Sequence, residues 1–377
     1  MPENATPELD KEIGPNWFAS VMGTGITATA AVGLPLFGEH LNYVGLGIWL
    51  LASLMLVVIL ILKILQTVFK PHVIKRQFDD PVMAQFFGAP PMALLTIAGG
   101  TLLLGHYVMA QETAITIAWT LWILGTLGGI AAAIIIPYRL FTHFEVREDA
   151  AFGGWLMPVV PPMVSAAIGA MLIPYASGIE LQQTLLYGCY ALFGISLVAA
   201  MIIITLIWSR LAYSGTSGGA RVPTLWIILG PLGQSITAAG ALGTAALLVV
   251  DQPIANGMKT FAILYGVPIW GFAVFWSIMA GMLTLRALRK KMPFALTWWA
   301  FTFPVGTCVT GTTQLALHTG LAAFEWAAVL SFAGLVVAWG IAAIGTIKGF
   351  KGGHILRTPT ASAHVVAKKN HSYRNPK

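Results

Sequence analysis

The chain has 377 residues, of which 57% are hydrophobic and 9% are charged, and its formal net charge is +7. A soluble globular domain carries about 25% charged residues, so this chain cannot cover itself with a polar surface in water. The composition excludes a soluble enzyme, a disordered protein and a nucleic-acid-binding domain, and it indicates an integral membrane protein.

The first fifteen residues are polar and acidic and have no basic region before the first apolar run, so we expect that run to be a retained helix. A bilayer core needs about 20 apolar residues for each helical span. Ten segments meet this need: 16–37, 43–66, 86–108, 113–137, 153–175, 184–208, 224–250, 261–287, 294–317 and 323–347. The sequence thus predicts a cytoplasmic segment 1–15, a transmembrane domain 16–347 and a basic, disordered cytoplasmic tail 348–377.

The basic residues alternate with these spans. With both termini in the cytoplasm, 20 of the 21 Lys and Arg residues lie on the inner side, and only Lys259 lies in an outer loop. This is the distribution that the positive-inside rule describes. We therefore expect a multi-pass protein of the cell (inner) membrane, whose partners are lipid and a small solute. The net charge of +7 needs no nucleic acid to explain it.

The odd-numbered spans start near residues 16, 86, 153, 224 and 294, which is a nearly constant interval. The period predicts five copies of one helical hairpin. The odd spans contain nine prolines and the even spans two. Proline frees backbone groups that must find partners away from lipid. The prediction is an all-α membrane protein of ten helices, with odd helices inside, even helices outside and a central pore.

The acidic residues lie in loops and tails, apart from Glu325 at the outer edge of the tenth span. Intramembrane carboxylates mark proton relays and cation paths, so the pattern disfavours both. Cys189 and Cys308 lie in apolar runs, and no metal-binding, nucleotide-binding or catalytic motif occurs. We expect no cofactor, no metal and no catalytic residue.

Backbone groups, hydroxyls and amides remain to line the pore, and exposed helix N-termini can stabilise an anion weakly. The candidate pore-lining residues are Gly23, Thr24, Gly25, Pro90, Pro91, Pro158, Pro161, Pro162, Gly230, Pro231, Gln234, Ser235, Thr302, Pro304, Thr307 and Thr310. For any single threonine, a hydrogen bond back to its own helix is the competing interpretation. Phe303 stands before Pro304, where the helix should bend and a ring could plug the pore. The competing interpretation is an ordinary buried phenylalanine.

Three histidines, His40, His106 and His318, fall at outer ends of spans. Their spacing matches no metal motif. His106 and His318 could tune pH response, and ordinary interfacial hydrogen bonding is the alternative.

Three stretches carry a resemblance to a known family: NWFASVMGTGI at 16–26, LWIILGPLGQS at 225–235 and WWAFTFP at 298–304. Together they resemble the tellurite-resistance/dicarboxylate transporter family, which includes malate permeases, sulfite efflux pumps and plant slow anion channels. The resemblance implies five helical hairpins around a pore, a homotrimer and a pore-occluding phenylalanine at Phe303. It does not make tellurite the substrate.

Three functions follow as hypotheses. The first is a conduit for small anions or C4-dicarboxylates such as malate, gated by an aromatic side chain. The second is a proton-coupled dicarboxylate or sulfite efflux transporter, for which the outer histidines are the only titrating candidates. The third, a membrane enzyme or sensor, lacks a visible catalytic constellation.

Overall fold

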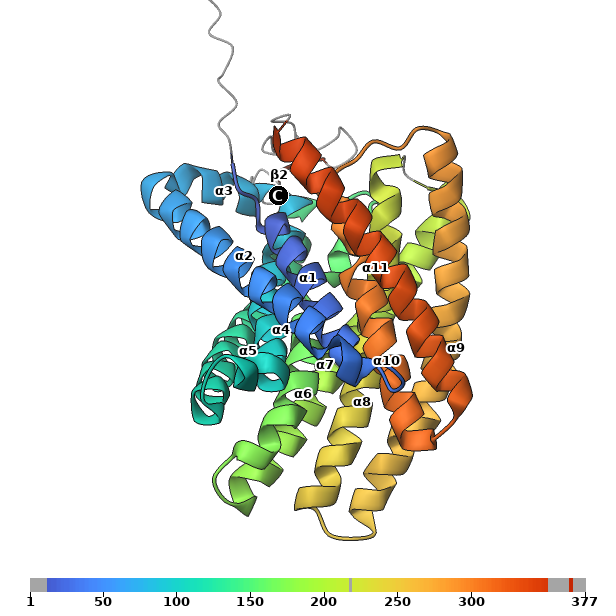
Figure 1. Cartoon of the computed structure of the whole chain (residues 1–377). Helices are drawn as coiled ribbons and strands as arrows, with labels where there is room; N and C mark the ends of the chain where they lie inside the picture. The colour runs from blue at the N-terminus through green and yellow to red at the C-terminus, as the bar shows by residue number, and fades with distance from the viewer. Residues whose placement is uncertain (1–11, 217–218, 352–365, 369–377) are drawn as a thin grey trace, which may run out of the picture.

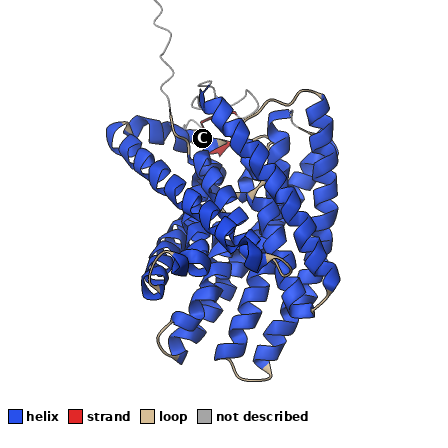
Figure 2. Ribbon diagram, in the orientation of Figure 1, coloured by secondary structure: helices blue, strands red, loops and turns tan. Residues whose placement is uncertain are grey.

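The computed structural model describes residues 12–216, 219–351 and 366–368, and these are almost wholly helical (Figure 2). The α-helices are α1 Phe18–Val32, α2 Asn42–Phe69, α3 Pro71–Asp79, α4 Ala89–Leu104, α5 Gln111–Thr142, α6 Pro161–Leu172, α7 Ile179–Ser214, α8 Leu229–Val249, α9 Ile254–Arg289, α10 Phe303–Thr319 and α11 Ala322–Lys351. The 3-10 helices are η1 Pro15–Trp17, η2 Gly38–Leu41, η3 Met83–Gly88, η4 Gly105–Tyr107, η5 Gly153–Leu156, η6 Ile173–Tyr175, η7 Gly219–Ile228 and η8 Leu296–Phe301.

Two short strands pair antiparallel, β1 Phe144–Glu145 and β2 Val366–Lys368. The predicted tail therefore contributes the end of α11 and the strand β2. The disorder predicted for residues 352–365 and 369–377, and the segment 1–11, lie outside the described residues.

Five helices form a closed inner ring, in which α1, α4, α6, α8 and α10 each pack against the next and α10 packs against α1. Each inner helix also packs against the helix that follows it in the hairpin: α2, α5, α7, α9 and α11. Every one of these outer helices touches a second inner helix as well. The outer helices thus lie over the grooves between inner helices (Figure 1).

Burial separates the two layers. In the most apolar stretch of the segments that contain α4 and α8, 72% of residues are buried, against 17–33% in the outer helices. The outer helices expose large apolar side chains such as Leu54, Ile134, Val198, Leu264 and Leu330. Such a surface suits lipid and not water. The burial pattern agrees with the predicted division into inner odd and outer even spans.

Among the described residues, seven helical segments are long and apolar enough to cross a membrane. The expectation of an all-α membrane protein is confirmed by this finding. The inner helices α1, α6 and α10 have 15, 12 and 17 residues and fall short of a span by length alone. That all ten segments cross the membrane stays a prediction.

The prolines act differently from the expectation. In α4, α6 and α10 the proline stands in the first helical turn, directly after or close to a 3-10 segment. A proline there costs no hydrogen bond, because the first N–H groups of a helix have no partner inside it. Proline occurs within the helix body in the outer helices, at Pro137 of α5 and Pro268 of α9. The prolines therefore start the inner helices and do not bend them in mid-course.

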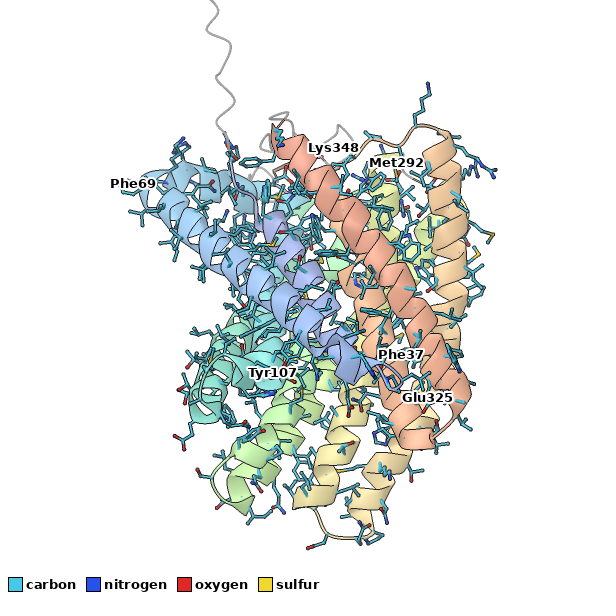
Figure 3. All side chains as sticks on the ribbon, in the orientation of Figure 1. Phe37, Phe69, Tyr107, Met292, Glu325 and Lys348 are labelled. Carbon is cyan, nitrogen blue, oxygen red and sulfur yellow. The ribbon has the colours of Figure 1, made fainter. Side chains whose placement is uncertain are left out.

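The connections lie at two opposite ends of the bundle. Figure 3 shows Phe69, Met292 and Lys348 at one end, and Phe37 and Glu325 toward the other. Phe69, Met292 and Lys348 belong to segments predicted to be cytoplasmic, whereas Phe37 and Glu325 stand at the predicted outer edges of the spans 16–37 and 323–347. The alternation read from the sequence therefore agrees with the direction of the helices.

Candidate functional site

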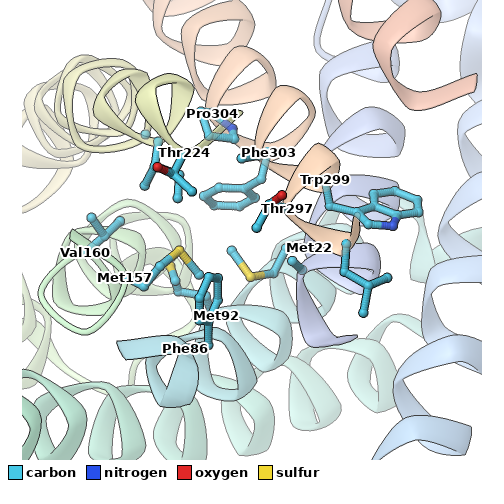
Figure 4. Close-up of a pocket in the computed structure, with 15 residues that line it drawn as sticks. Met22, Phe86, Met92, Met157, Val160, Thr224, Thr297, Trp299, Phe303 and Pro304 are labelled. Carbon is cyan, nitrogen blue, oxygen red and sulfur yellow. The ribbon is translucent and has the colours of Figure 1, made fainter. Parts of the chain in front are cut away.

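Phe303 separates two cavities along the axis of the inner ring. Its ring is 5% exposed and contributes to the wall of both. One cavity lies toward the end that holds Met292, and the other lies toward the opposite end. We call them the inner and the outer cavity, and Figure 4 shows the inner cavity with Phe303 projecting into it.

Every helix of the ring contributes one stripe of lining residues. The outer-cavity stripes are Ile26, Thr29, Ala30 and Gly33 of α1; Thr96, Gly99 and Leu103 of α4; Val164, Ala167, Ile168 and Met171 of α6; Gln234, Thr237 and Ala241 of α8; and Phe303, Thr310, Thr313, Gln314 and Leu317 of α10. The steps of three and four residues keep each stripe on one helix face. The two cavities thus lie one above the other along the ring axis.

The inner cavity is mainly apolar. Phe86 and three methionines, Met22, Met92 and Met157, face Phe303 across it (Figure 4). Thr224 and Thr297 add its hydroxyl groups, and Thr224 donates to the carbonyl oxygen of Arg221 at 2.7 Å. The flexible thioether side chains can adapt to a ring that changes position.

The outer cavity is polar on one side. Its two amide side chains are Gln234 of α8 and Gln314 of α10, and three of its five threonines also come from these two helices. The wall contributed by α6 is apolar. Among the residues that the structure describes, no charged side chain lines either cavity, so a solute would meet hydroxyls, amides and apolar surface.

Five of the predicted path residues lie at these cavities. Gly230 and Pro304 line the inner cavity, Gln234 and Thr310 line the outer cavity, and Phe303 borders both. Thr310 and Thr237 share a hydrogen bond of 2.8 Å between their hydroxyl oxygens. The neighbouring α8 and α10 stripes are therefore linked side chain to side chain.

The predicted residues of α1 lie in helix packing instead. A side chain at Gly23 would collide with Thr302, and one at Gly25 would lie 2.7 Å from the methyl group of Thr96. The hydroxyl of Thr24 accepts a hydrogen bond of 3.1 Å from the indole N–H of Trp339 in α11. These three positions permit close packing of α1 and do not belong to either cavity wall.

Three further predicted hydroxyl residues are buried outside the cavity walls. Thr302 donates to the carbonyl of Trp299 at 2.6 Å. Thr307 donates to the carbonyl of Pro304 at 2.7 Å, and Ser235 accepts a bond of 2.8 Å from the hydroxyl of Tyr265. Thr302 and Thr307 follow the competing interpretation, in which threonines bond to backbone carbonyls of their own segment.

The predicted prolines other than Pro304 also lie away from both cavities. Pro91 packs against α5, since a side chain at Gly128 would lie 3.4 Å from its Cβ. Pro161 packs against the same helix, since a side chain at Gly129 would lie 2.8 Å from the Cβ of Pro161. The positions outside the two lining sets are Pro90, Pro91, Pro158, Pro161, Pro162 and Pro231.

The two histidines differ in their surroundings. His106 is exposed, with its ring 4.1 Å from that of Tyr107. His318 contacts the carbonyl oxygen of Gly240 through Nε2 at 3.0 Å, and its Nδ1 is buried without a partner. Neither histidine lines a cavity, and no group of three His, Cys, Asp or Glu in the described ranges could hold a metal ion.

The sequence reasoning did not single out the methionines of the inner cavity or Thr96 of the outer one. Extending the helical period from Gln234 through Thr237 to Ala241 would have found the α8 stripe. No comparable signal marks Met22 of α1, Met92 of α4 and Met157 in the turn between η5 and α6, because they come from three segments far apart in the sequence.

The fold defines a multi-pass membrane protein with two cavities along the axis of its inner ring, and Phe303 lines both. Residues 12–347 match the voltage-dependent anion channel family. The match covers most of the chain, so the protein belongs to this family, and it is an anion transporter. This finding confirms the resemblance that the three sequence stretches indicated.

Curated relatives cover similar lengths. The chain is 27% identical to an uncharacterized transporter of Methanocaldococcus jannaschii over 83% of this chain and 86% of the relative. It is 29% identical to a sulfite efflux pump of Trichophyton rubrum, over 80% and 81% of the two chains. It is 22% identical to a malic acid transport protein of Schizosaccharomyces pombe, over 82% and 72%.

Proposed function

We propose that the chain carries small oxyanions, of the sulfite or C4-dicarboxylate (malate-like) kind, through the axis of its inner ring, and that Phe303 is the gate. The observation that carries the proposal is the position of this one ring between two uncharged cavities. A pore must bind an ion weakly enough to release it, which hydroxyls and amides achieve without fixed charge. The printed functions of the fungal relatives support the choice of anions.

Passive or weakly coupled transport fits the structure better than proton coupling. A coupled transporter needs a titrating group on the solute path, and within the described part of the chain no titratable side chain lines either cavity. Transport, and not catalysis, fits the family and the relatives.

The test is flux into proteoliposomes that contain the purified wild-type protein. We expect sulfite, malate or chloride to exchange faster than in protein-free vesicles, and sodium to be excluded. Transport should not require an imposed proton gradient. Cation flux, or anion flux equal to that of empty vesicles, would refute the proposal.

Orientation and assembly complete the proposal. The start of α1 and the end of α11 lie at the same end of the bundle (Figure 1), and Lys348 of α11 marks that end in Figure 3. We propose that this end faces the cytoplasm and that the protein lies in the cell membrane. The proposed domain limits are 1–15, 16–347 and 348–377. We also expect a homotrimer, by resemblance to the family. Labelling of single cysteines from either side, and the native mass in detergent, test these two points.

A further inference from the structure

The polar groups of the outer cavity differ in whether their hydrogen-bonding capacity is already used. Thr96 donates to the carbonyl of Met92 at 2.8 Å, and Thr29 donates to the carbonyl of Ile26 at 3.2 Å. Each hydroxyl has a single proton. These two threonines therefore have no proton left for a solute.

The pair formed by Thr237 and Thr310 is also saturated. Thr237 reaches the carbonyl of Gly233 at 3.0 Å, and Thr310 reaches the carbonyl of Thr307 at 3.1 Å. One of the two hydroxyls also donates to the other. Two protons serve these contacts, so none remains for a solute without breaking a bond.

Three lining groups remain uncommitted. Thr313 is 6% exposed, and its buried hydroxyl has no hydrogen-bond partner among the described residues. Gln234 is 3% exposed and lines the cavity, and its side-chain amide makes no hydrogen bond to another described residue. Gln314 lies further out, against Gly240. All three lie on the α8 and α10 side of the conduit.

Gln234 is the first residue of α8 that lines the outer cavity. Gly230, one helical turn earlier on α8, lines the inner cavity, and Phe303 lines both. The α8 wall therefore passes from one cavity to the other between Gly230 and Gln234. An amide that lines a cavity and bonds to no other described residue can still donate to and accept from a solute there.

We propose that Gln234 is the selectivity residue of the conduit, and that it recognises an oxyanion that carries its own hydroxyl group. The inference rests on the proposed function. A carboxamide donates through its N–H groups and accepts through its oxygen. Hydrogensulfite and a hydroxycarboxylate such as malate offer the matching acceptor oxygen and O–H donor, whereas a halide offers no donor.

The other walls of the outer cavity strengthen the preference. In the ring, α8 faces α1 and α4, whose lining threonines, Thr29 and Thr96, already donate to backbone carbonyls. The neighbouring α6 wall is apolar. A solute therefore receives hydrogen bonds from the α8 and α10 side only, and the contacts of a single amide carry more weight than they would in an evenly polar pore. A site built to bond a hydroxyl rejects the analogue that lacks it, because its own polar groups then stay unpaired.

The test is the ratio of oxyanion flux to chloride flux in proteoliposomes at mildly acidic pH, with hydrogensulfite and malate as separate arms. Gln234→Met keeps the side-chain length and removes the amide. Losing its bonds should lower the ratio by about tenfold. A fall in the sulfite arm alone assigns the site to an inorganic oxyanion, a fall in the malate arm alone to a carboxylate, and a fall in both to the shared chemistry.

The matched control is Thr101→Val. Thr101 is buried in α4 outside both lining sets, and it already donates its proton to the carbonyl of Ile97 at 2.8 Å. The flux ratio of this variant should stay within about twofold of wild type. If Gln234→Met does not fold, as judged by thermal unfolding in detergent, Thr313→Val is compared with Thr101→Val, and Thr313→Val should lower the ratio. A conducting Gln234→Met variant with an unchanged ratio would overturn this inference alone. A wild-type protein that carries no anion would overturn the proposed function as well.

Discussion

Replacing Phe303 with alanine should raise anion flux strongly. The ring is 5% exposed and lines both the inner and the outer cavity. Burying a phenylalanine ring stabilises its position by about 2 kcal/mol. If the ring must leave this position to open the conduit, the closed conformation is favoured by about thirtyfold. The alanine variant removes this preference and joins the two cavities, so we expect flux to rise by at least about tenfold.

The same substitution should lower the free energy of unfolding by about 3 kcal/mol, near the lower end for a buried phenylalanine, because cavities already flank the ring. The assay is anion flux into proteoliposomes, with thermal unfolding in detergent as the stability measurement. The matched control is Phe301→Ala, two residues away, where the ring packs on Trp226 at 5.6 Å and lines neither cavity. Equal flux in wild type and a folded Phe303→Ala variant would refute the gate, and so would an equal rise in the Phe301→Ala control.

Three other substitutions test the site and its frame. Gly233→Ala should lower the unfolding temperature, because the new Cβ would lie 2.7 Å from a backbone carbonyl oxygen of α10. The control Gly230→Ala should be tolerated, because its Cβ meets nothing within 4 Å. Equal decreases in unfolding temperature for the two variants would contradict this packing. Thr24→Val should lower the free energy of unfolding by about 1 kcal/mol, because it loses the hydrogen bond from the indole of Trp339. The ratio of oxyanion flux to chloride flux should stay unchanged. A changed ratio would indicate that Thr24 lines the solute path after all. His318→Ala should leave flux independent of a proton gradient, as in wild type, because the ring lies outside both cavity walls; gradient-driven uptake that His318→Ala or His106→Ala abolishes would favour the proton-coupled alternative.

The excess of proline in the odd spans marks the inner helices, but not because proline bends them. The excess of proline in odd spans predicted inner helices, and those helices are indeed the buried ones. The reason lies at their starts, where a 3-10 segment leads into a helix with proline in its first turn. Composition counts the prolines in a span but does not tell a helix start from a kink, since both remove one backbone donor.

The candidate path residues show a similar limit. Gln234 and Thr310 belong to the outer cavity, while Thr302 and Thr307 of the same threonine-rich region turn to backbone carbonyls. All four are small or amide residues in spans without charge. Only the rotation of each helix about its axis decides which of them faces the conduit, and that rotation follows from contacts between helices that are distant in the sequence.

The sequence alone determined the class of protein, because a chain with 9% charged residues cannot face water over its whole surface. It also predicted the helical segments and the two layers, since hydrophobicity, charge and repeat spacing are properties of consecutive residues. The tertiary structure alone decided that Phe303 lines two cavities. It also decided that the amide of Gln234 lines the outer cavity without a hydrogen bond to another described residue. Both facts depend on five helices meeting around one axis, and no local pattern records which faces meet there.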